Sequence, residues 1–120
     1  MPTVMLVDDD PTLRAALQLK LERAGYQVSA VGTGGEFLAR LQLHKPDLIL
    51  LDLMMPDMSG LEVLEYLRSD AALSSIPVVV VTAWGHGAMQ ARCMELGAVG
   101  FVTKPFSLRE LAKTVEEHLA

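Results

Sequence analysis

Five polar side chains that follow hydrophobic runs of this 120-residue sequence carry groups able to do chemistry together. They are Asp8, Asp9, Asp52, Thr82 and Lys104. Three clustered carboxylates repel one another unless a cation balances them, and a hard divalent ion such as Mg²⁺ prefers oxygen ligands. An aspartate can also act as a nucleophile toward a phosphoryl group, whose oxygens then need positive charge. Mg²⁺ and Lys104 would supply that charge, with Mn²⁺ as a second candidate ion, and Thr82 would donate a hydrogen bond.

An alternation of short hydrophobic runs and amphipathic segments must bring these residues together. The patterns predict strands over 3–7, 26–31, 47–53, 76–83 and 99–104, and helices over 11–25, 33–43, 59–69, 87–97 and 107–120. Strands that alternate with helices predict a parallel sheet covered on both faces, which explains strands without polar alternation. Because ligands bind at the carboxyl ends of such strands, the five polar residues should share one mouth.

Local signals predict where the helices begin and which residues they bury. Asp10 before Pro11 is typical of an N-cap followed by the first helical position. Three later helices open on capping-box patterns, formed by Thr33 and Glu36, Ser59 and Glu62, and Ser107 and Glu110. In the segment 87–97, helical spacing runs through Ala88, Ala91 and Met94.

Composition narrows the class of protein. Hydrophobic residues make up 51% and charged residues 21%, which favours one packed domain over residues 1–120, with no effector domain in this chain. The net charge of −5 argues against direct nucleic-acid binding. Cys93 is the only cysteine, the N-terminus has no signal-peptide pattern, and no run is long enough to span a membrane. We therefore expect a cytoplasmic domain without membrane contact.

The sequence resembles a receiver domain of the bacterial two-component response-regulator family, to which chemotaxis regulators belong. Four stretches carry the resemblance, in the family's order and spacing: "VMLVDDDP", "PDLILLDLMMPDMSGLEVL", "IPVVVVTA" and "GAVGFVTKPF". Together they are highly specific, and the match covers essentially all 120 residues. The resemblance implies an α/β, flavodoxin-like (βα)5 three-layer sandwich, with a five-stranded parallel sheet in the order 2-1-3-4-5 and helices on both faces.

The resemblance also implies a metal site and a phosphoacceptor. Asp52 matches the aspartate that is phosphorylated and also contributes to the metal site. Asp8 and Asp9 match the acidic pair that holds Mg²⁺, with Asp9 favoured as the direct ligand. Met54 falls where a backbone carbonyl completes the metal shell, so its side chain need not be polar.

Three further residues match the family's switch. Thr82 matches the switch hydroxyl, and Phe101 takes the place of the switch aromatic, without a tyrosine hydroxyl. Lys104 matches the lysine that pairs with the phosphoryl group, and it precedes Pro105, where family members usually have a cis bond.

The implied function is a phosphorylation-switched signalling domain that catalyses only its own phosphorylation and dephosphorylation. A sensor histidine kinase or a histidine phosphotransfer protein would phosphorylate Asp52. The surface of the fourth helix, fifth strand and fifth helix would then change its affinity for a downstream output protein or a fused effector domain. A phosphorylation-dependent homodimer is a further candidate partner.

Two other classes of protein compete with this interpretation. A pseudo-receiver would bind a partner constitutively, although the complete set of five polar residues argues against it. An enzyme of the same architecture would be a phosphatase or would bind a nucleotide or flavin. Nucleotide binding would need a phosphate-cradling loop, and neither G-x-G-x-x-G after the first strand nor G-x-x-x-x-G-K-[ST] occurs. The stretch "DDDP" would also repel the phosphate of a flavin.

Two apolar residues beside the predicted mouth lead to a prediction about phosphate lifetime. Met54 and Trp84 occupy positions that, by the resemblance, modulate hydrolysis of the acyl phosphate, and neither has a polar side chain to orient a water. We expect slow self-dephosphorylation, and the variants Met54→Asn and Trp84→Glu should shorten the half-life of the phosphorylated protein. Decay of radiolabelled protein measures this half-life, and an unchanged value in both variants would contradict the hypothesis.

Overall fold

The computed structural model describes residues 1–83 and 87–119, which form five strands and five helices in strict alternation. The elements are β1 (Thr3–Val7), α1 (Pro11–Arg23), β2 (Gln27–Val31), α2 (Gly34–Leu43), β3 (Leu48–Leu51), α3 (Gly60–Ser69), β4 (Val78–Thr82), α4 (Gly87–Glu95), β5 (Gly100–Thr103) and α5 (Leu108–Leu119). Every predicted element is present, and most end one or two residues inside the predicted ranges. None of the described helices has the length and apolarity that a membrane crossing requires.

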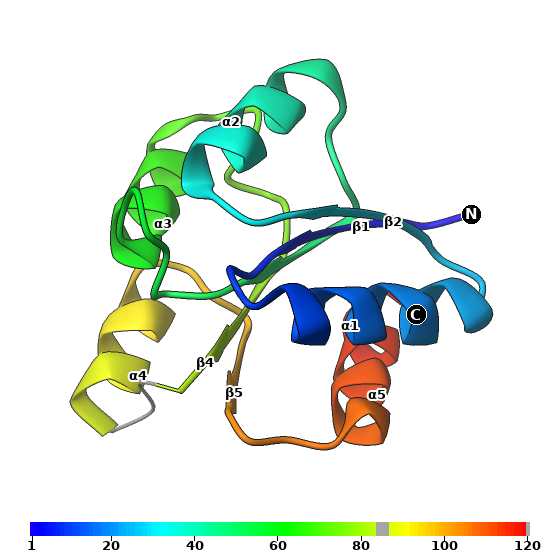
Figure 1. Cartoon of the computed structure of the whole chain (residues 1–120). Helices are drawn as coiled ribbons and strands as arrows, with labels where there is room; N and C mark the ends of the chain where they lie inside the picture. Colours follow the sequence, from blue (N-terminus) through cyan, green and yellow to red (C-terminus); the bar gives the residue numbers. More distant parts are fainter. Residues whose placement is uncertain (84–86, 120) are drawn as a thin grey trace.

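The five strands form one parallel sheet in the order β2-β1-β3-β4-β5, which confirms the expected topology (Figure 1). The register brings the last residues of neighbouring strands level with one another. Val7 of β1 pairs with Val31 of β2 and with Leu51 of β3. Thr82 of β4 pairs with Thr103 of β5. The carboxyl ends of all five strands therefore lie along one edge.

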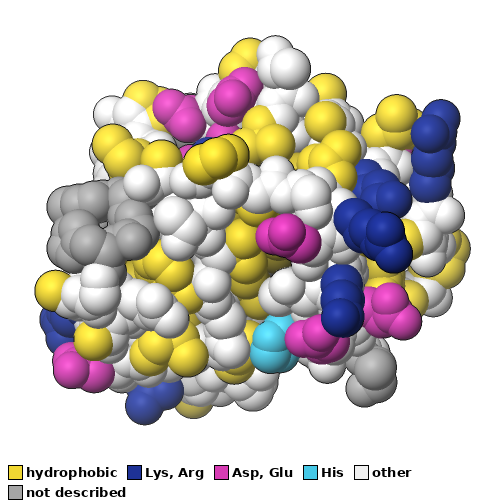
Figure 2. All heavy atoms as spheres, turned by 90° about the horizontal axis from the view of Figure 1, so that it is seen from below, with side chains coloured by type: hydrophobic (Ala, Val, Ile, Leu, Met, Phe, Trp, Pro, Cys, Tyr) yellow, Lys and Arg dark blue, Asp and Glu magenta, His cyan; other side chains and the backbone are white. Residues whose placement is uncertain are grey.

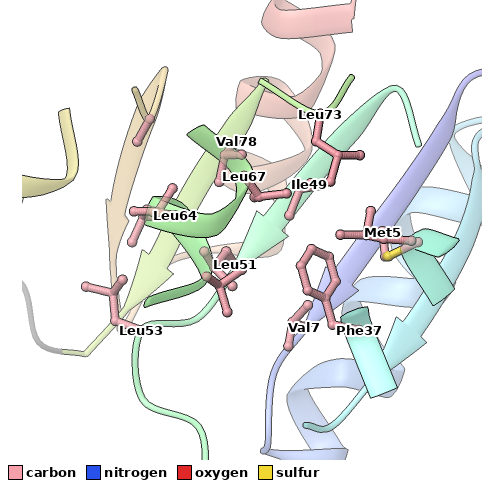
Figure 3. Close-up of a cluster of buried hydrophobic side chains, with 14 of the residues drawn as sticks. Met5, Val7, Phe37, Ile49, Leu51, Leu53, Leu64, Leu67, Leu73 and Val78 are labelled. Atoms are coloured by element: carbon pink, nitrogen blue, oxygen red, sulfur yellow. The ribbon is translucent and has the colours of Figure 1, made fainter. Parts of the chain in front are cut away.

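Helices cover both faces of the sheet and enclose two hydrophobic clusters. On one face, strand residues such as Met5, Ile49 and Val78 pack with side chains of α2, α3 and α4, including the fully buried Phe37 (Figures 1 and 3). On the other face, the alternate strand residues pack with α1 and α5. Successive strand side chains point to opposite faces, so uninterrupted apolar strands supply both clusters. The predicted three-layer sandwich is confirmed.

Capping side chains fix the helix starts largely as the sequence predicts. The Asp10 carboxylate accepts the Thr12 and Leu13 N–H groups at 3.0 and 3.2 Å, directly before Pro11. Thr33 and Ser107 cap their helices by accepting the N–H groups of Glu36 and Glu110, at 3.1 and 3.0 Å. Ser59 caps α3 as well, but its hydroxyl accepts the Leu61 N–H at 3.1 Å rather than that of Glu62. The three caps are confirmed, although that at Ser59 uses a different amide.

The buried face of α4 differs from the predicted one. The helix is present and is followed by Gly97 at φ 95°, where a left-handed turn favours glycine. However, Ala88, Ala91 and Met94 are exposed. The helix instead buries Cys93, with Met89 and Leu96 half-buried against the α2–α3–α4 cluster. Both sets have helical spacing, and the larger apolar volume of the second set decides which one faces the sheet.

Charge is distributed unevenly over the surface. Seen from below, lysine and arginine side chains gather on the side where α1 and α5 lie (Figure 2). Residues of these helices that line shallow hollows there include Lys20, Arg23, Arg109 and Lys113. Within 1–83 and 87–119, none of these four side chains pairs with a carboxylate within 4.0 Å. A chain with a net charge of −5 thus gathers four basic side chains in one region, where Glu116 also lines one of the hollows.

Asp57 ties the loop after β3 to the start of α2, a contact that the sequence analysis did not predict. Its two carboxylate oxygens accept the N–H groups of Gly34 and Gly35, each at 2.9 Å. These hydrogen bonds, first that of Gly35 and then that of Gly34, lower the pKa of the Asp57 carboxyl below its usual value. The Met58 side chain packs against Gly34, where a Cβ would displace it.

This contact predicts a pH-dependent contribution to stability. A carboxyl whose pKa is lowered on folding stabilises the fold above its unfolded pKa, near 3.8, and loses that effect as the pH falls through the lower folded value. We expect Asp57→Ala to lower the urea midpoint at pH 7, and the difference from wild type to shrink below pH 3.8. Glu117→Ala, which removes an equal charge from an exposed position, is the control. Equal effects of the two substitutions at pH 7 would contradict the role of the hydrogen bonds.

Candidate functional site

Three aspartates meet at the edge where the strands end. Asp8 follows β1 directly and Asp52 follows β3 directly, and both side chains are buried, with only 1% and 3% of their surface exposed. Asp9 is exposed. One carboxylate oxygen from each of the three lies within 4.8 Å of the others. The structure thus brings together the acidic residues that the sequence analysis predicted to share one mouth.

Lys104, directly after the edge strand β5, bridges the two buried carboxylates. Its Nζ lies 2.8 Å from Asp8 Oδ2 and 2.9 Å from Asp52 Oδ2. The Lys104 side chain is itself only 19% exposed. An ion pair in such surroundings is little screened by water, so the ammonium is the group that makes two buried carboxylates tolerable in this arrangement.

The pKa shifts of Asp8 and Lys104 express this balance. Burial raises the pKa of the Asp8 carboxyl above its usual value, although the hydrogen bonds from Lys104 and the Asp10 N–H act in the opposite direction. Burial alone would lower the pKa of the Lys104 ammonium, but its hydrogen bonds to Asp8 and Asp52 outweigh burial and raise it. Lys104 is therefore charged near neutral pH, while burial makes the ionised form of Asp8 unfavourable.

Backbone N–H groups hold the other carboxylate oxygens in place. Asp8 Oδ1 accepts the Asp10 N–H at 2.9 Å, and Asp52 Oδ1 accepts the Met54 N–H at 3.0 Å. Each loop thus folds back on the aspartate that begins it. In contrast, the Asp9 carboxylate makes no hydrogen bond to any residue in 1–83 or 87–119. Two carboxylates are fixed, and the third is available for a ligand.

The other predicted residues differ in burial and in the contacts that they make. Thr82 is fully buried at the end of β4, and its carbonyl oxygen accepts the Lys104 N–H at 2.8 Å. The Lys104–Pro105 peptide bond is cis, as the resemblance implied. Phe101 is half-buried on β5 and packs against the α2–α3–α4 cluster rather than within the acidic group. Met54 exposes 54% of its surface. Trp84 lies outside the described residues.

The donor set fits a hard divalent cation. Three carboxylates carry three negative charges when ionised and Lys104 returns one, so the cluster has a formal charge of −2. Oxygen donors are the ligands that Mg²⁺ and Mn²⁺ prefer. A bound divalent ion would therefore neutralise the cluster through Asp8, Asp9 and Asp52.

Arg14 is a residue at this site that the sequence analysis missed. Its Nη1 donates to the backbone carbonyl of Asp8 at 2.7 Å. The available signal was its place at the end of the first turn of α1, where a long side chain can reach back to the loop before the helix. The sequence does not reveal that the acceptor is a carbonyl rather than one of three nearby carboxylates.

Comparison with known proteins identifies the class. A model of the response regulator receiver domain matches residues 4–116. The chain is 37% identical over 116 residues to the DNA-binding response regulator MtrA of Mycolicibacterium smegmatis. The matched region covers 97% of this chain and 50% of that protein. The chain spans about half the length of the curated relatives it matches.

Solved structures agree with the sequence comparison. The chemotaxis response regulator CheY4 of Vibrio cholerae has a TM-score of 0.92 at 31% identity, over 99% of both chains. The receiver domain of a signal transduction histidine kinase from Syntrophus aciditrophicus has a TM-score of 0.89 at 35% identity, over 99% of this chain and 90% of that one.

The chain belongs to the response regulator receiver domain family. It is a phosphorylation-switched signalling module with an acidic pocket formed by Asp8, Asp9 and Asp52, rather than a conventional enzyme. The acidic triad is typical of the metal-binding site of receiver domains.

The unfavourable burial of ionised Asp8 predicts that the pocket lowers the free energy of unfolding when no metal is bound. An acid whose pKa is raised on folding loses stability as the pH rises from its unfolded to its folded pKa, so ionised Asp8 destabilises the fold at neutral pH. Asp8→Asn leaves one ammonium for one carboxylate. We expect it to raise the free energy of unfolding at pH 7 in EDTA by about 1 kcal/mol.

Mg²⁺ should reverse the order of stability of wild type and Asp8→Asn. Because a ligand stabilises only the state that binds it, saturating Mg²⁺ should stabilise wild type and leave Asp8→Asn almost unchanged. Urea unfolding with EDTA and with Mg²⁺ measures both effects. A variant that is less stable than wild type in EDTA would show that Asp8 stabilises the empty pocket.

Proposed function

We propose that Asp52 accepts a phosphoryl group from the phosphohistidine of a sensor histidine kinase or a histidine phosphotransfer protein. The observation that carries the proposal is the placement of Asp52 Oδ2 against Lys104, within a group of three carboxylates. A carboxylate oxygen of Asp52 attacks phosphorus, the phosphorus–nitrogen bond breaks, and the donor imidazole leaves. The product is an acyl phosphate on Asp52.

Asp8, Asp9, Asp52 and the Met54 backbone carbonyl would hold Mg²⁺, and Mn²⁺ is a second fitting ion. The bound ion supplies positive charge that phosphoryl transfer requires on the phosphoryl oxygens. The Met54 N–H fixes the Asp52 carboxylate by its Oδ1, at 3.0 Å, which orients the nucleophile before the donor arrives. Lys104 is already charged and within reach, so it can pair with a phosphoryl group attached to Asp52.

Thr82 and Phe101 would convert the new charge into a change of surface. The Thr82 hydroxyl would move toward the phosphoryl oxygens, and Phe101 would move toward the space that this leaves. Two contacts support the coupling: the Lys104 N–H donates to the Thr82 carbonyl at 2.8 Å, and Phe101 pairs with Val80 across β4 and β5. A charge at one edge thereby biases a two-state element, which includes the surface of α4, β5 and α5.

The output depends on what binds that surface. We propose a downstream protein or an effector domain fused to this receiver, with a phosphorylation-dependent homodimer as a further state. MtrA, CheY4 and the Syntrophus receiver support this range, because their names describe a DNA-binding regulator, a chemotaxis regulator and a part of a histidine kinase.

Labelling with radioactive acetyl phosphate tests the phosphoacceptor. Wild type should incorporate label with Mg²⁺ and almost none when EDTA replaces Mg²⁺ in the reaction, whereas Asp52→Asn should incorporate almost none with Mg²⁺ present. Asp47→Asn is the matched control, because Asp47 is an exposed aspartate directly before β3, at the opposite end of that strand from Asp52. It should be labelled like wild type.

Two outcomes would overturn the proposal. Unchanged labelling of Asp52→Asn would place the phosphoryl group elsewhere. No labelling of wild type, together with intact partner binding, would favour a constitutive binding module without phosphorylation.

A further inference from the structure

Arg14 lies beside the acidic pocket but donates its hydrogen bond to a backbone carbonyl. The half-buried Arg14 side chain donates through Nη1 to the Asp8 carbonyl at 2.7 Å. Within residues 1–83 and 87–119 it pairs with no carboxylate within 4.0 Å, although Asp8, Asp9 and Asp10 are all in the adjoining loop. A charged donor on a neutral carbonyl still gives a strong hydrogen bond, so Arg14 holds the backbone of the loop rather than its charges.

Gly32, directly after β2, provides the space for this arrangement. A Cβ at Gly32 would lie 2.8 Å from Arg14 Nη1 and 3.4 Å from its Cζ. The φ angle of Gly32 lies outside the left-handed range, so its backbone suits alanine. The Arg14 guanidinium supplies all three nearest atoms that an added methyl group would meet. Alanine at this position would therefore displace Arg14 without removing its charge.

The held carbonyl belongs to the peptide group that joins Asp8 to Asp9. Because that group is planar, a hydrogen bond on its oxygen also fixes the orientation of the Asp9 N–H and Cα. The Asp8 N–H is bonded to the Val31 carbonyl at 3.1 Å on the other side. The exposed Asp9 carboxylate has no hydrogen bond of its own to the described residues, so the backbone is what sets the direction of its Cα–Cβ bond and thus the region that the carboxylate can reach.

We propose that Arg14 is a positioning residue for the divalent-cation site: it fixes the Asp8–Asp9 peptide so that the Asp9 carboxylate points toward those of Asp8 and Asp52, and Gly32 leaves it the room to do so. The inference rests on the proposed function, because it concerns the same cation site. It adds two residues to that function, Arg14 of α1 and Gly32 directly after β2, and neither of them would be a ligand of the ion.

Positioning and simple electrostatics predict opposite effects of removing Arg14. If Arg14 acted only through its charge, its loss would make the pocket more negative and strengthen cation binding. If Arg14 positions Asp9, its loss releases one ligand and weakens binding. Losses of supporting interactions around metal ligands weaken affinity about 10- to 100-fold, and we expect about tenfold here.

Isothermal titration of Mg²⁺ into wild type and variants tests the proposal. Arg14→Ala and Gly32→Ala should each raise the Kd about tenfold. The double variant should be no weaker than Arg14→Ala, because the added methyl group then meets no guanidinium. Arg23→Ala, which removes an exposed cation from the far end of α1, is the matched control and should bind like wild type.

The same set separates positioning from a loss of folding. Urea midpoints measured in EDTA report the fold without the ion, and Gly32→Ala provides a second variant if Arg14→Ala does not fold. A Kd for Arg14→Ala within twofold of wild type, or tighter, overturns the inference, as do additive losses in the double variant. Wild type that binds no Mg²⁺ overturns the proposed function together with this inference, whereas binding with unaffected variants overturns this inference alone.

Discussion

One ammonium group shared by two buried carboxylates is the interaction on which the site depends. Lys104 comes from the end of β5, which is two strands from β3 and three from β1 in the sheet order. With neighbouring strands roughly 4.8 Å apart, the Lys104 backbone lies on the order of 10 Å from that of Asp52. Only a long, flexible side chain can cross β4 and still reach both Asp8 and Asp52, at 2.8 and 2.9 Å. The sheet order therefore requires a long cationic side chain at the end of β5.

The same arrangement leaves the pocket short of positive charge. Five apolar strands keep polar groups out of the sheet interior and concentrate them at one edge, where burial makes ionised Asp8 unfavourable. Natural folds tolerate an unfavourable buried charge at a functional site because binding of the ligand compensates that charge. A divalent ion and a phosphoryl group change the charge of this edge in opposite senses. The proposed switch would act on this charge balance around Lys104.

Three loops keep the site organised by hydrogen bonds, whereas the Asp9 carboxylate makes none to the described residues. The loop after β1 is fixed by the Asp8 and Asp10 hydrogen bonds and by Arg14, and the loop after β3 by Met54 and Asp57. The loop after β5 is joined to β4 through Thr82. Most of these hydrogen bonds join a side chain to a backbone group, and those accepted by Asp8, Asp52 and Asp57 are strongest while the carboxylates are ionised. Asp9 is the carboxylate with the fewest such restraints.

The sequence by itself determined the elements, the caps and the identity of the acidic residues, because these follow from periodicities and hydrogen bonds that span a few residues. Asp10, Thr33 and Ser107 act locally, and the resemblance carried by four stretches implied the strand order. Periodicity could not choose between the two faces of α4, because both Ala88–Ala91–Met94 and Met89–Cys93–Leu96 have helical spacing. Only the tertiary structure decided the contacts of Asp57 with Gly34 and Gly35, of Arg14 with the Asp8 carbonyl, and of Lys104 with two aspartates rather than one. These partners come from loops that are separate in the sequence and meet in space. The spacing of residues along the chain does not show which loops lie close together.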